Sequence, residues 1–197
     1  MTAAERREQL IGIARRAFAE RGFDGVSVEE IAARAAVSKP VVYEHFGGKE
    51  GLYAVVVDRE VQELLGTMRE ALTATSQRML LEQATFALLD YVEASSDGFR
   101  ILVRDSPPGS GIGKYVSIIS DTVTRVEGIL GDQFAARGFD PKVAPLYAQM
   151  LVGMVSTTGQ WWLDARTPAK DVVAAHLVNL AWNGLANLEQ DPELRGR

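Results

Sequence analysis

The sequence predicts an all-α protein of about nine helices, with a small N-terminal helical head followed by a larger helical domain. Apolar residues recur at helical spacing along most of the 197-residue chain, and no segment keeps the alternation typical of a strand. No internal repeat of the solenoid kind is present. Hydrophobic residues make up 47% and charged residues 24%, so the chain can bury a core without disulfides.

Two helices are expected to open the chain. Apolar residues spaced as on one helix face predict a first helix over residues 3–21, with Gly22 as its C-cap. Ser27 is the expected N-cap of a second helix that ends near Ala35, and Glu30 completes a capping box with it. These two helices form the first part of the head.

A third short helix is expected between Ser38 and His45. Ser38 is its expected N-cap, and Pro40 fits the first turn, where no backbone N–H is needed. Gly47 and Gly48 then break the chain. Further helices are expected over residues 49–72, 76–95, 98–105, 113–137, 141–165 and 168–188.

Two of the later helices have a start marked by proline. Asp140 precedes Pro141, and Thr167 precedes Pro168, so each places a capping residue before a proline in the first helical position. We expect the two helices to begin at these dipeptides.

The segment 27–52 has the spacing of a helix-turn-helix. Two short helices are joined by a tight turn at residues 36–38, and Ile31, Ala32 and Val42 are spaced to fill the wedge between them. In this motif the first helix braces the second, which enters the major groove and reaches base edges with its N-terminal residues. The sequence therefore predicts that the helix beginning after Ser38 contacts double-stranded DNA.

The side chains around that helix suit a DNA contact. Lys39 can donate to guanine acceptors, and Pro40 and Val41 offer apolar contact to a thymine methyl. Phe46 is expected in the core beneath the turn. Phosphates are expected to be bound by hydroxyl or ring N–H donors and by one ammonium at a helix start: Ser27, Ser38, Tyr43, His45 and Lys49.

Three runs of residues resemble the tetracycline-repressor (TetR) family. They are AFAERGF at 17–23, SVEEIAARAAVS at 27–38 and VYEHFGGKEGL at 42–52, and the match covers about the first 55 residues. The resemblance implies a one-component regulator with a DNA-binding head at 1–48 and a helical domain for dimerisation and ligand binding at 49–197. It also implies that the family's DNA contacts fall on Ser27, Ser38, Lys39, Pro40, Tyr43, His45 and Lys49.

Two residues depart from the family pattern. Ala36 stands where the turn usually has glycine, and a left-handed backbone there would cost about 1 kcal/mol. Glu44 puts a negative charge on the DNA-reading helix, where it either points outward or accepts a hydrogen bond from a cytosine amine.

The last two expected helices carry no Asp, Glu, Lys or Arg over residues 143–163 and 172–188. Such helices are expected to be buried on more than one side, most simply against the same helices of a second copy. Gly153, Gly159 and Gly184 would allow close approach. A homodimer would read a palindromic operator with heads spaced by about 34–36 Å or a multiple. The alternative is a fully buried hairpin in a monomer.

The central helices are rich in aromatic and thioether side chains, which predicts a pocket for a small apolar or aromatic effector. The alternative is that these residues are plain core or dimer contacts. Asp90 could pair with a cationic ligand or with Arg100 or Arg104. Effector binding is expected to tilt the helix that begins at Lys49 and so move the head. The candidate lining residues are Phe86, Leu89, Asp90, Leu102, Tyr115, Ile118, Tyr147, Leu151, Met154 and Trp162.

Composition argues against several other classes. The chain has no cysteine and only two histidines, so a metal site is not expected, and no cofactor is expected either. The net charge is −5, and residues 1–50 carry eight basic and eight acidic residues, so DNA contacts must come from placed side chains. No signal-peptide pattern opens the chain, which predicts a cytoplasmic protein.

Three alternatives concern membranes, enzymes and adaptors. Residues 143–163 are long enough to span a bilayer, but their polar content favours a buried helix without membrane contact. The run GSGIGK at 109–114 resembles a phosphate-binding loop, yet Pro108 and Tyr115 break the required pattern, and a non-enzymatic loop is predicted. A helical ligand-binding or interaction protein whose head no longer reads DNA is the remaining alternative.

Overall fold

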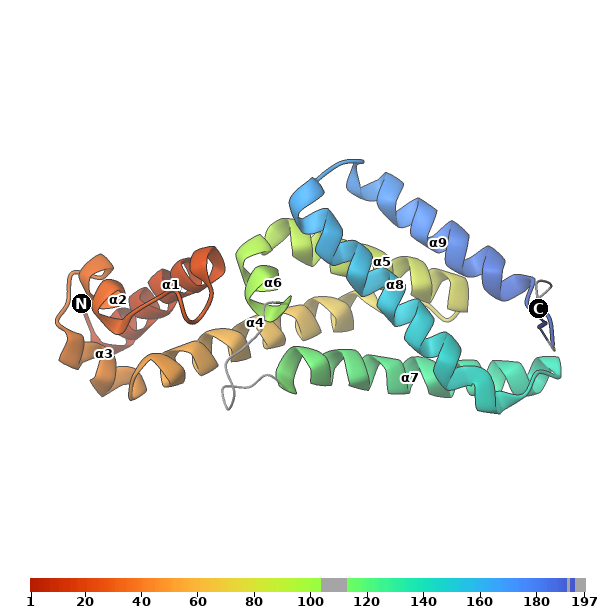
Figure 1. Ribbon diagram of the computed structural model, residues 1–197, viewed down its shortest axis with the longest axis horizontal. Helices are drawn as coiled ribbons and strands as arrows, with labels where there is room; N and C mark the ends of the chain where they lie inside the picture. The colour runs from red at the N-terminus through yellow and green to blue at the C-terminus, as the bar shows by residue number, and fades with distance from the viewer. Residues whose placement is uncertain (104–112, 191, 194–197) are drawn as a thin grey trace. The chain divides into compact units, whose positions relative to one another are not determined.

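The computed structural model describes residues 1–103, 113–190, 192 and 193, without the side chains of 113–117. These residues form nine α-helices and one short 3-10 helix and no strand, which confirms the all-α prediction (Figure 1). They fall into two compact units, one built from residues 1–67 and 91–116 and the other from 68–90 and 117–197. The functional boundary predicted after residue 48 stays a prediction.

Four helices begin the chain: α1 (Ala3–Arg21), α2 (Val28–Arg34), α3 (Lys39–Phe46) and α4 (Lys49–Ala71). Ser27 caps α2 as predicted, because its Oγ accepts from the Glu30 N–H at 3.1 Å. The second half of the predicted capping box is absent from α2, since the Glu30 carboxylate instead binds Arg34 at 2.8 Å and also binds Arg21. Ser38 holds the N-cap position of α3 but makes no capping hydrogen bond.

The remaining helices are α5 (Gln77–Ala94), α6 (Ser96–Val103), α7 (Gly113–Arg137), α8 (Ala144–Ala165) and α9 (Lys170–Ala186). Asp140 caps the 3-10 helix Pro141–Val143, which leads into α8. The start predicted at Thr167 was wrong, because α9 has Ala169 as its N-cap. The Thr167 hydroxyl donates to the Ala165 carbonyl instead, and the Trp162 indole binds the Pro168 carbonyl at 2.9 Å.

An aromatic core fixes the first helices to one another. Phe18 lies edge-on to Tyr53 at 5.0 Å between ring centroids, and Phe23 packs against the same ring at 5.0 Å. Leu10, Ile31, Val42 and Leu52 of the same helices are completely buried. α1 packs against α2 and α6, and α2 packs against α3. This packing holds α3 at the surface of the unit.

The second unit has its own core, made by α7 and α8. Phe134 is buried there, with the Tyr147 ring edge-on at 5.3 Å and the Phe139 ring at 5.6 Å. Arg137 donates to the carbonyls of Leu185 and Ala186 at 3.2 and 3.3 Å, which ties the end of α9 to α7. Within the described residues, no helix is long and apolar enough to cross a membrane.

The turn between α2 and α3 has the left-handed residue that the sequence predicted. Ala36 has φ of 54°. We expect Ala36→Gly to raise the free energy of unfolding by about 0.5–1 kcal/mol, because glycine has no Cβ to strain at this φ. The matched control is Ala33→Gly at an exposed position of α2, which should lower the free energy of unfolding by about 1 kcal/mol. Denaturant unfolding measures both, and two changes of the same sign would contradict the assignment.

Candidate DNA-binding face

α3 turns one side chain into the core and most of the others outward. Val42 is completely buried, whereas Lys39, Pro40, Tyr43 and Glu44 are exposed. Val41 and His45 are half-buried, and Ser38 is exposed at the helix start. Every predicted contact on α3 is therefore at or near the surface, and Glu44 is among the outward side chains. Phe46, predicted in the core, is half-buried beneath the Arg7 guanidinium, 4.5 Å from its ring centroid.

Lys39 is bound to α2 rather than free in solvent. Its Nζ donates to Glu29 Oε1 at 2.5 Å and lies 5.6 Å from the centroid of the Tyr43 ring. The hydrogen bond raises the pKa of Lys39 and lowers the pKa of Glu29. Both side chains are largely exposed, so the pair is weak and DNA can compete for the ammonium.

We expect Glu29→Gln to tighten DNA binding by about two- to tenfold, because it frees Lys39 and removes a negative charge beside the phosphates. The measurement is the dissociation constant for a selected duplex at fixed salt. Glu82→Gln breaks the similarly exposed pair between Arg78 and Glu82 on α5 and should leave the constant unchanged. Unchanged or weaker binding by Glu29→Gln would show that Lys39 is not used.

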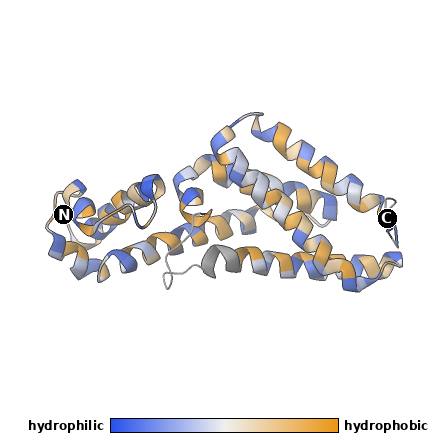
Figure 2. Ribbon diagram, in the orientation of Figure 1, coloured by the Kyte–Doolittle hydropathy of each residue, from blue (hydrophilic) through white to orange (hydrophobic). Residues whose placement is uncertain are grey.

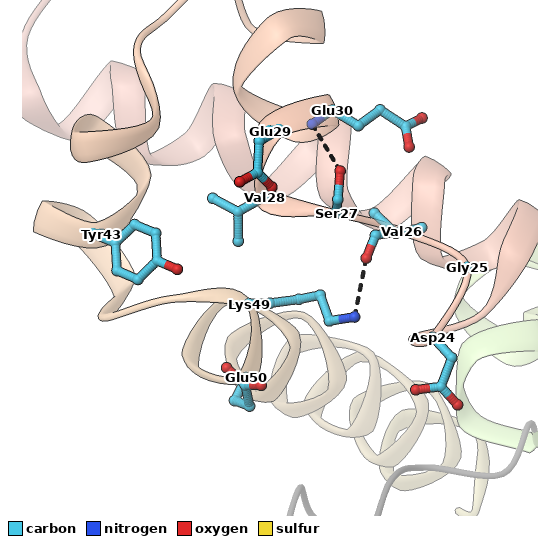
Figure 3. A pocket seen from close by; sticks show the side chains of 10 residues that line it. All are labelled: Asp24, Gly25, Val26, Ser27, Val28, Glu29, Glu30, Tyr43, Lys49 and Glu50. Atoms are coloured by element: carbon cyan, nitrogen blue, oxygen red, sulfur yellow. Dashed lines mark hydrogen bonds between the residues drawn. The ribbon is translucent and has the colours of Figure 1, made fainter.

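A cleft of about 440 Å³ lies beside α3, between the start of α2 and the start of α4 (Figure 3). Three predicted phosphate ligands, Ser27, Tyr43 and Lys49, line it. Ser27 uses its hydroxyl oxygen as an acceptor in capping α2 and keeps its O–H as a donor. The other lining residues are Asp24, Gly25, Val26, Val28, Glu29, Glu30 and Glu50.

Lys49 has a structural role that the sequence did not show. Its Nζ donates to the carbonyls of Phe23 and Val26, both at 3.0 Å, and lies 4.0 Å from the centroid of the Phe23 ring. Figure 3 shows the side chain reaching back across the cleft to Val26. An ammonium has three N–H donors, so one stays available for a phosphate while the other two hold the 23–26 loop.

The predicted effector residues are distributed over both units. Leu102, which is buried, and Tyr115 belong to the first unit, and the other eight belong to the second. In the second unit Leu89 and Trp162 are buried and Phe86 is exposed; Ile118, Tyr147, Leu151 and Met154 are half-buried. The side chain of Tyr115 lies outside the described residues, as does most of the 109–114 run.

Asp90 pairs with a residue that the sequence analysis did not consider. Its carboxylate binds Lys170 at 2.6 Å, joining α5 to the start of α9. Arg100 and Arg104 were the predicted partners, and Arg104 lies outside the described residues. The missed partner was beyond the reach of sequence spacing, because residues 90 and 170 meet only in the folded chain.

Glu29 is the other site residue that sequence reasoning missed. It stands in the first turn of α2, and acidic residues are favoured at the start of any helix. An acidic residue at this position therefore did not by itself indicate a contact with Lys39. A signal was available: the two residues stand ten positions apart on the two helices of the motif, which its tight turn keeps close together.

An outward helix braced by a second short helix, with donors at the surface on both, defines a helix-turn-helix DNA-binding protein. Residues 10–56 match the family described as "Bacterial regulatory proteins, tetR family", and residues 67–196 match "Tetracyclin repressor-like, C-terminal domain". The chain therefore belongs to the TetR family of bacterial transcriptional regulators, which bind DNA as ligand-responsive dimers.

Named relatives cover much of the chain. The HTH-type transcriptional activator FasR of Mycolicibacterium smegmatis is 33% identical over 187 residues, covering 93% of this chain and 84% of its own length. The HTH-type transcriptional repressor KstR2 of Rhodococcus jostii is 30% identical over 97 residues, covering 49% of this chain and 48% of its own. A TetR-like regulator from Rhodococcus sp. RHA1 has a similar structure, with a TM-score of 0.75, 25% identity and coverage of 95% and 100%.

Family membership decides between the main alternatives. The chain is a DNA-binding transcriptional regulator and not an enzyme. The prediction from the helix-turn-helix spacing is thus confirmed at the level of family and fold. The individual DNA contacts and effector contacts stay predictions.

Proposed function

We propose that this regulator works in the cytoplasm as a symmetric dimer that reads a palindromic operator with two copies of α3 and leaves it when a small apolar or aromatic effector binds. The observation that carries the proposal is the outward face of α3, where Lys39, Pro40 and Tyr43 are exposed around a single buried anchor, Val42. Such a helix can enter a major groove without any rearrangement of its own core.

The dimer proposal is supported by the uncharged faces of α8 and α9. Leu146, Met150 and Trp161 of α8 are all more than half exposed, and their spacing of four and eleven residues places them on one side of the helix. On α9 Leu180 is 65% exposed and Val172 is 43% exposed, eight residues apart. Figure 2 shows much of α9 coloured as hydrophobic. A second copy is the proposed occupant, because the same faces on two chains form a four-helix interface.

The effector proposal is supported by incomplete burial of aromatic and thioether side chains in the second unit. Tyr147, Leu151 and Met154 lie along α8 and are half-buried in the isolated chain. Tyr147 and Leu151 pack against the core that contains Phe134. Side chains of this kind accept an apolar or aromatic compound. We propose repression as the mode of control. A bound dimer represses transcription when its operator overlaps the DNA site that RNA polymerase uses.

The test is selection of bound duplexes from a random pool, followed by titration of the selected duplex at several salt concentrations. The proposal predicts an inverted repeat, and binding that weakens steeply with salt because phosphate contacts release counterions. Anilinonaphthalene sulfonate, an aromatic probe, should bind the protein and lower its operator affinity. Transcription in vitro then gives the mode of control, since a repressor lowers the transcript and an activator raises it. Failure to select any duplex would favour a helical interaction protein.

A further inference from the structure

A buried polar cluster joins three parts of the first unit. Arg15 of α1 binds Glu60 of α4 through two hydrogen bonds, from Nε to Oε1 at 2.6 Å and from Nη2 to Oε2 at 3.2 Å. The same Nη2 donates to Ser95 Oγ, between α5 and α6, at 2.8 Å. Tyr91 near the end of α5 donates from its hydroxyl to Glu60 Oε2 at 3.2 Å. One carboxylate therefore holds α1 and the α5–α6 junction together on α4.

The carboxylate and the phenol of the cluster are enclosed, while the guanidinium reaches the surface. Glu60 is 3% exposed and Tyr91 is 2% exposed, whereas the Arg15 side chain is 29% exposed. Burial, reinforced by the negative charge of Glu60, raises the pKa of Tyr91, and the hydrogen bond that Arg15 donates to Glu60 raises the pKa of Arg15. At neutral pH the phenol thus stays protonated and the guanidinium stays charged. A buried carboxylate is stable only while such partners surround it, so few other arrangements are open to these side chains.

The backbone of α6 closes the cluster on its remaining side. A Cβ placed on Gly98 would lie 1.7 Å from Glu60 Oε2 and 2.9 Å from Arg15 Nη2. The absence of a side chain at Gly98 therefore lets α6 approach the ion pair. The ion pair between α1 and α4 is therefore also close to α6, which packs against α1.

A second ion pair between α1 and α4 provides a contrast. Arg59 binds Glu8 through two hydrogen bonds at 2.5 and 2.6 Å, and both side chains are about half exposed. An exposed pair is weak, because water can replace either partner when the helices turn. The buried pair cannot be broken in that way without leaving a charge unpaired in the interior. Of the two links, the buried one sets the angle between α1 and α4.

We propose that Glu60 is a positioning residue for operator reading: through Arg15, Tyr91 and Ser95 it fixes the angle of α1 on α4 and α6. Because α1 packs against α2 and α2 against α3, this angle also sets the direction in which α3 is presented. The inference rests on the proposed function. It goes beyond that function because Glu60 is buried and bound to other side chains of the protein, and so acts on operator reading without being one of the predicted DNA contacts. In a dimer, a fixed direction of each α3 on its α4 restricts the half-site spacings that both heads can read.

The test compares the selected operator with a version lengthened by one base pair between its half-sites. The insertion turns one half-site by about 34–36° and moves it by about 3.4 Å, which a head held at a fixed angle cannot follow. The first variant is Arg15→Met combined with Glu60→Met, which removes both charges and leaves none unpaired. The second is Tyr91→Phe, which removes one hydrogen bond and keeps the ion pair. The matched control is Glu8→Gln combined with Arg59→Gln, which breaks the exposed link between the same two helices.

The wild type and the control should bind the lengthened operator at least about tenfold more weakly than the selected one. The ratio of the dissociation constant for the lengthened operator to that for the selected one should fall to about threefold or less in the double methionine variant. It should fall by a smaller amount in Tyr91→Phe. A purely structural role would reduce the folded fraction and weaken binding to both duplexes equally, so the ratio would not change. If the double variant does not fold, the same ratio is measured on Tyr91→Phe and on Gly98→Ala, in which the added methyl group displaces the Glu60 carboxylate. In both, the ratio should be lower than in the wild type.

The two proposals fail in different ways. If the wild type binds the lengthened and the selected operator equally well, the two heads of a dimer do not read the half-sites together, which contradicts the proposed function. A wild type that discriminates, together with cluster variants that keep the full ratio, would overturn the role of Glu60 and leave the proposed function standing. Loss of discrimination in the Glu8 and Arg59 control would also overturn it, because the exposed link would then set the angle.

Discussion

Leu180→Arg is expected to convert the protein into a monomer and to weaken operator binding by about 100-fold or more, since linked sites gain two to four orders of magnitude in affinity. Leu180 is 65% exposed in the isolated chain and lies on the uncharged face of α9. In the proposed dimer the arginine would bring two like charges into an apolar four-helix interface without partners. Sedimentation equilibrium at micromolar protein measures the assembly, and operator titration measures the binding.

A second variant and a control make this result specific. Met150→Arg places the same charge on the exposed face of α8 and should have the same two effects. Met79→Arg replaces a methionine that is 53% exposed on α5 and should leave assembly and binding unchanged. A dimer that survives both Leu180→Arg and Met150→Arg would show that these helices are not its interface.

Lys39→Ala is expected to reduce the binding free energy by about 2–6 kcal/mol per dimer, because one contact of about 1–3 kcal/mol is lost in each half-site. The ammonium lies at the start of α3 and needs to leave only one exposed acidic partner, Glu29, to reach a base. The loss should be concentrated at one base pair that occurs once in each half-site. Titration of operators substituted at each position measures both the size and the location of the effect.

The control for Lys39→Ala is Lys142→Ala, which removes an exposed lysine from the 3-10 helix before α8. It should change operator affinity by less than about twofold, since no DNA contact is predicted for this lysine and exposed charges without a direct contact are screened. If Lys39→Ala loses no more affinity than Lys142→Ala, α3 does not read the operator through this residue.

Helix limits set by local signals were predictable, and limits set by tertiary contacts were not. Ser27 and Asp140 cap the expected helices because each acts on a backbone N–H two or three residues away. Thr167 has the same local signal, but α9 starts later, after a Pro168 carbonyl that the Trp162 indole binds. The missing half of the capping box has a partly similar cause, since Arg21 of α1 binds the Glu30 carboxylate together with the local i,i+4 partner Arg34.

The candidate DNA face was predictable in outline, because the helix-turn-helix is a local motif whose spacings lie within 26 consecutive residues, 27–52. The pairing of Lys39 with Glu29 and the double carbonyl contact of Lys49 were not, since each depends on the angle between two helices. Lys39 and Lys49 are therefore both bound to other groups of the protein in the absence of DNA.

The buried cluster around Glu60 escaped the sequence analysis altogether. Its members Arg15 and Ser95 stand 80 positions apart, so no spacing rule relates them. One signal was present: Glu60 lies four residues from both Val56 and Leu64, on the apolar face of α4. A charged residue in such a stripe calls for a buried partner, although the sequence alone cannot say which.

The most direct test of the central claim is to locate α3 on the operator. The chain has no cysteine, so Pro40→Cys gives a single thiol on exposed α3 that can carry an iron chelate which cleaves nearby DNA. We predict two equal clusters of cleavage, related by the operator's two-fold axis and about 34–36 Å or a multiple apart, with none at those positions from Lys142→Cys. Cleavage in one cluster only, or none from Pro40→Cys on a bound operator, would contradict a dimer that reads DNA through two copies of α3.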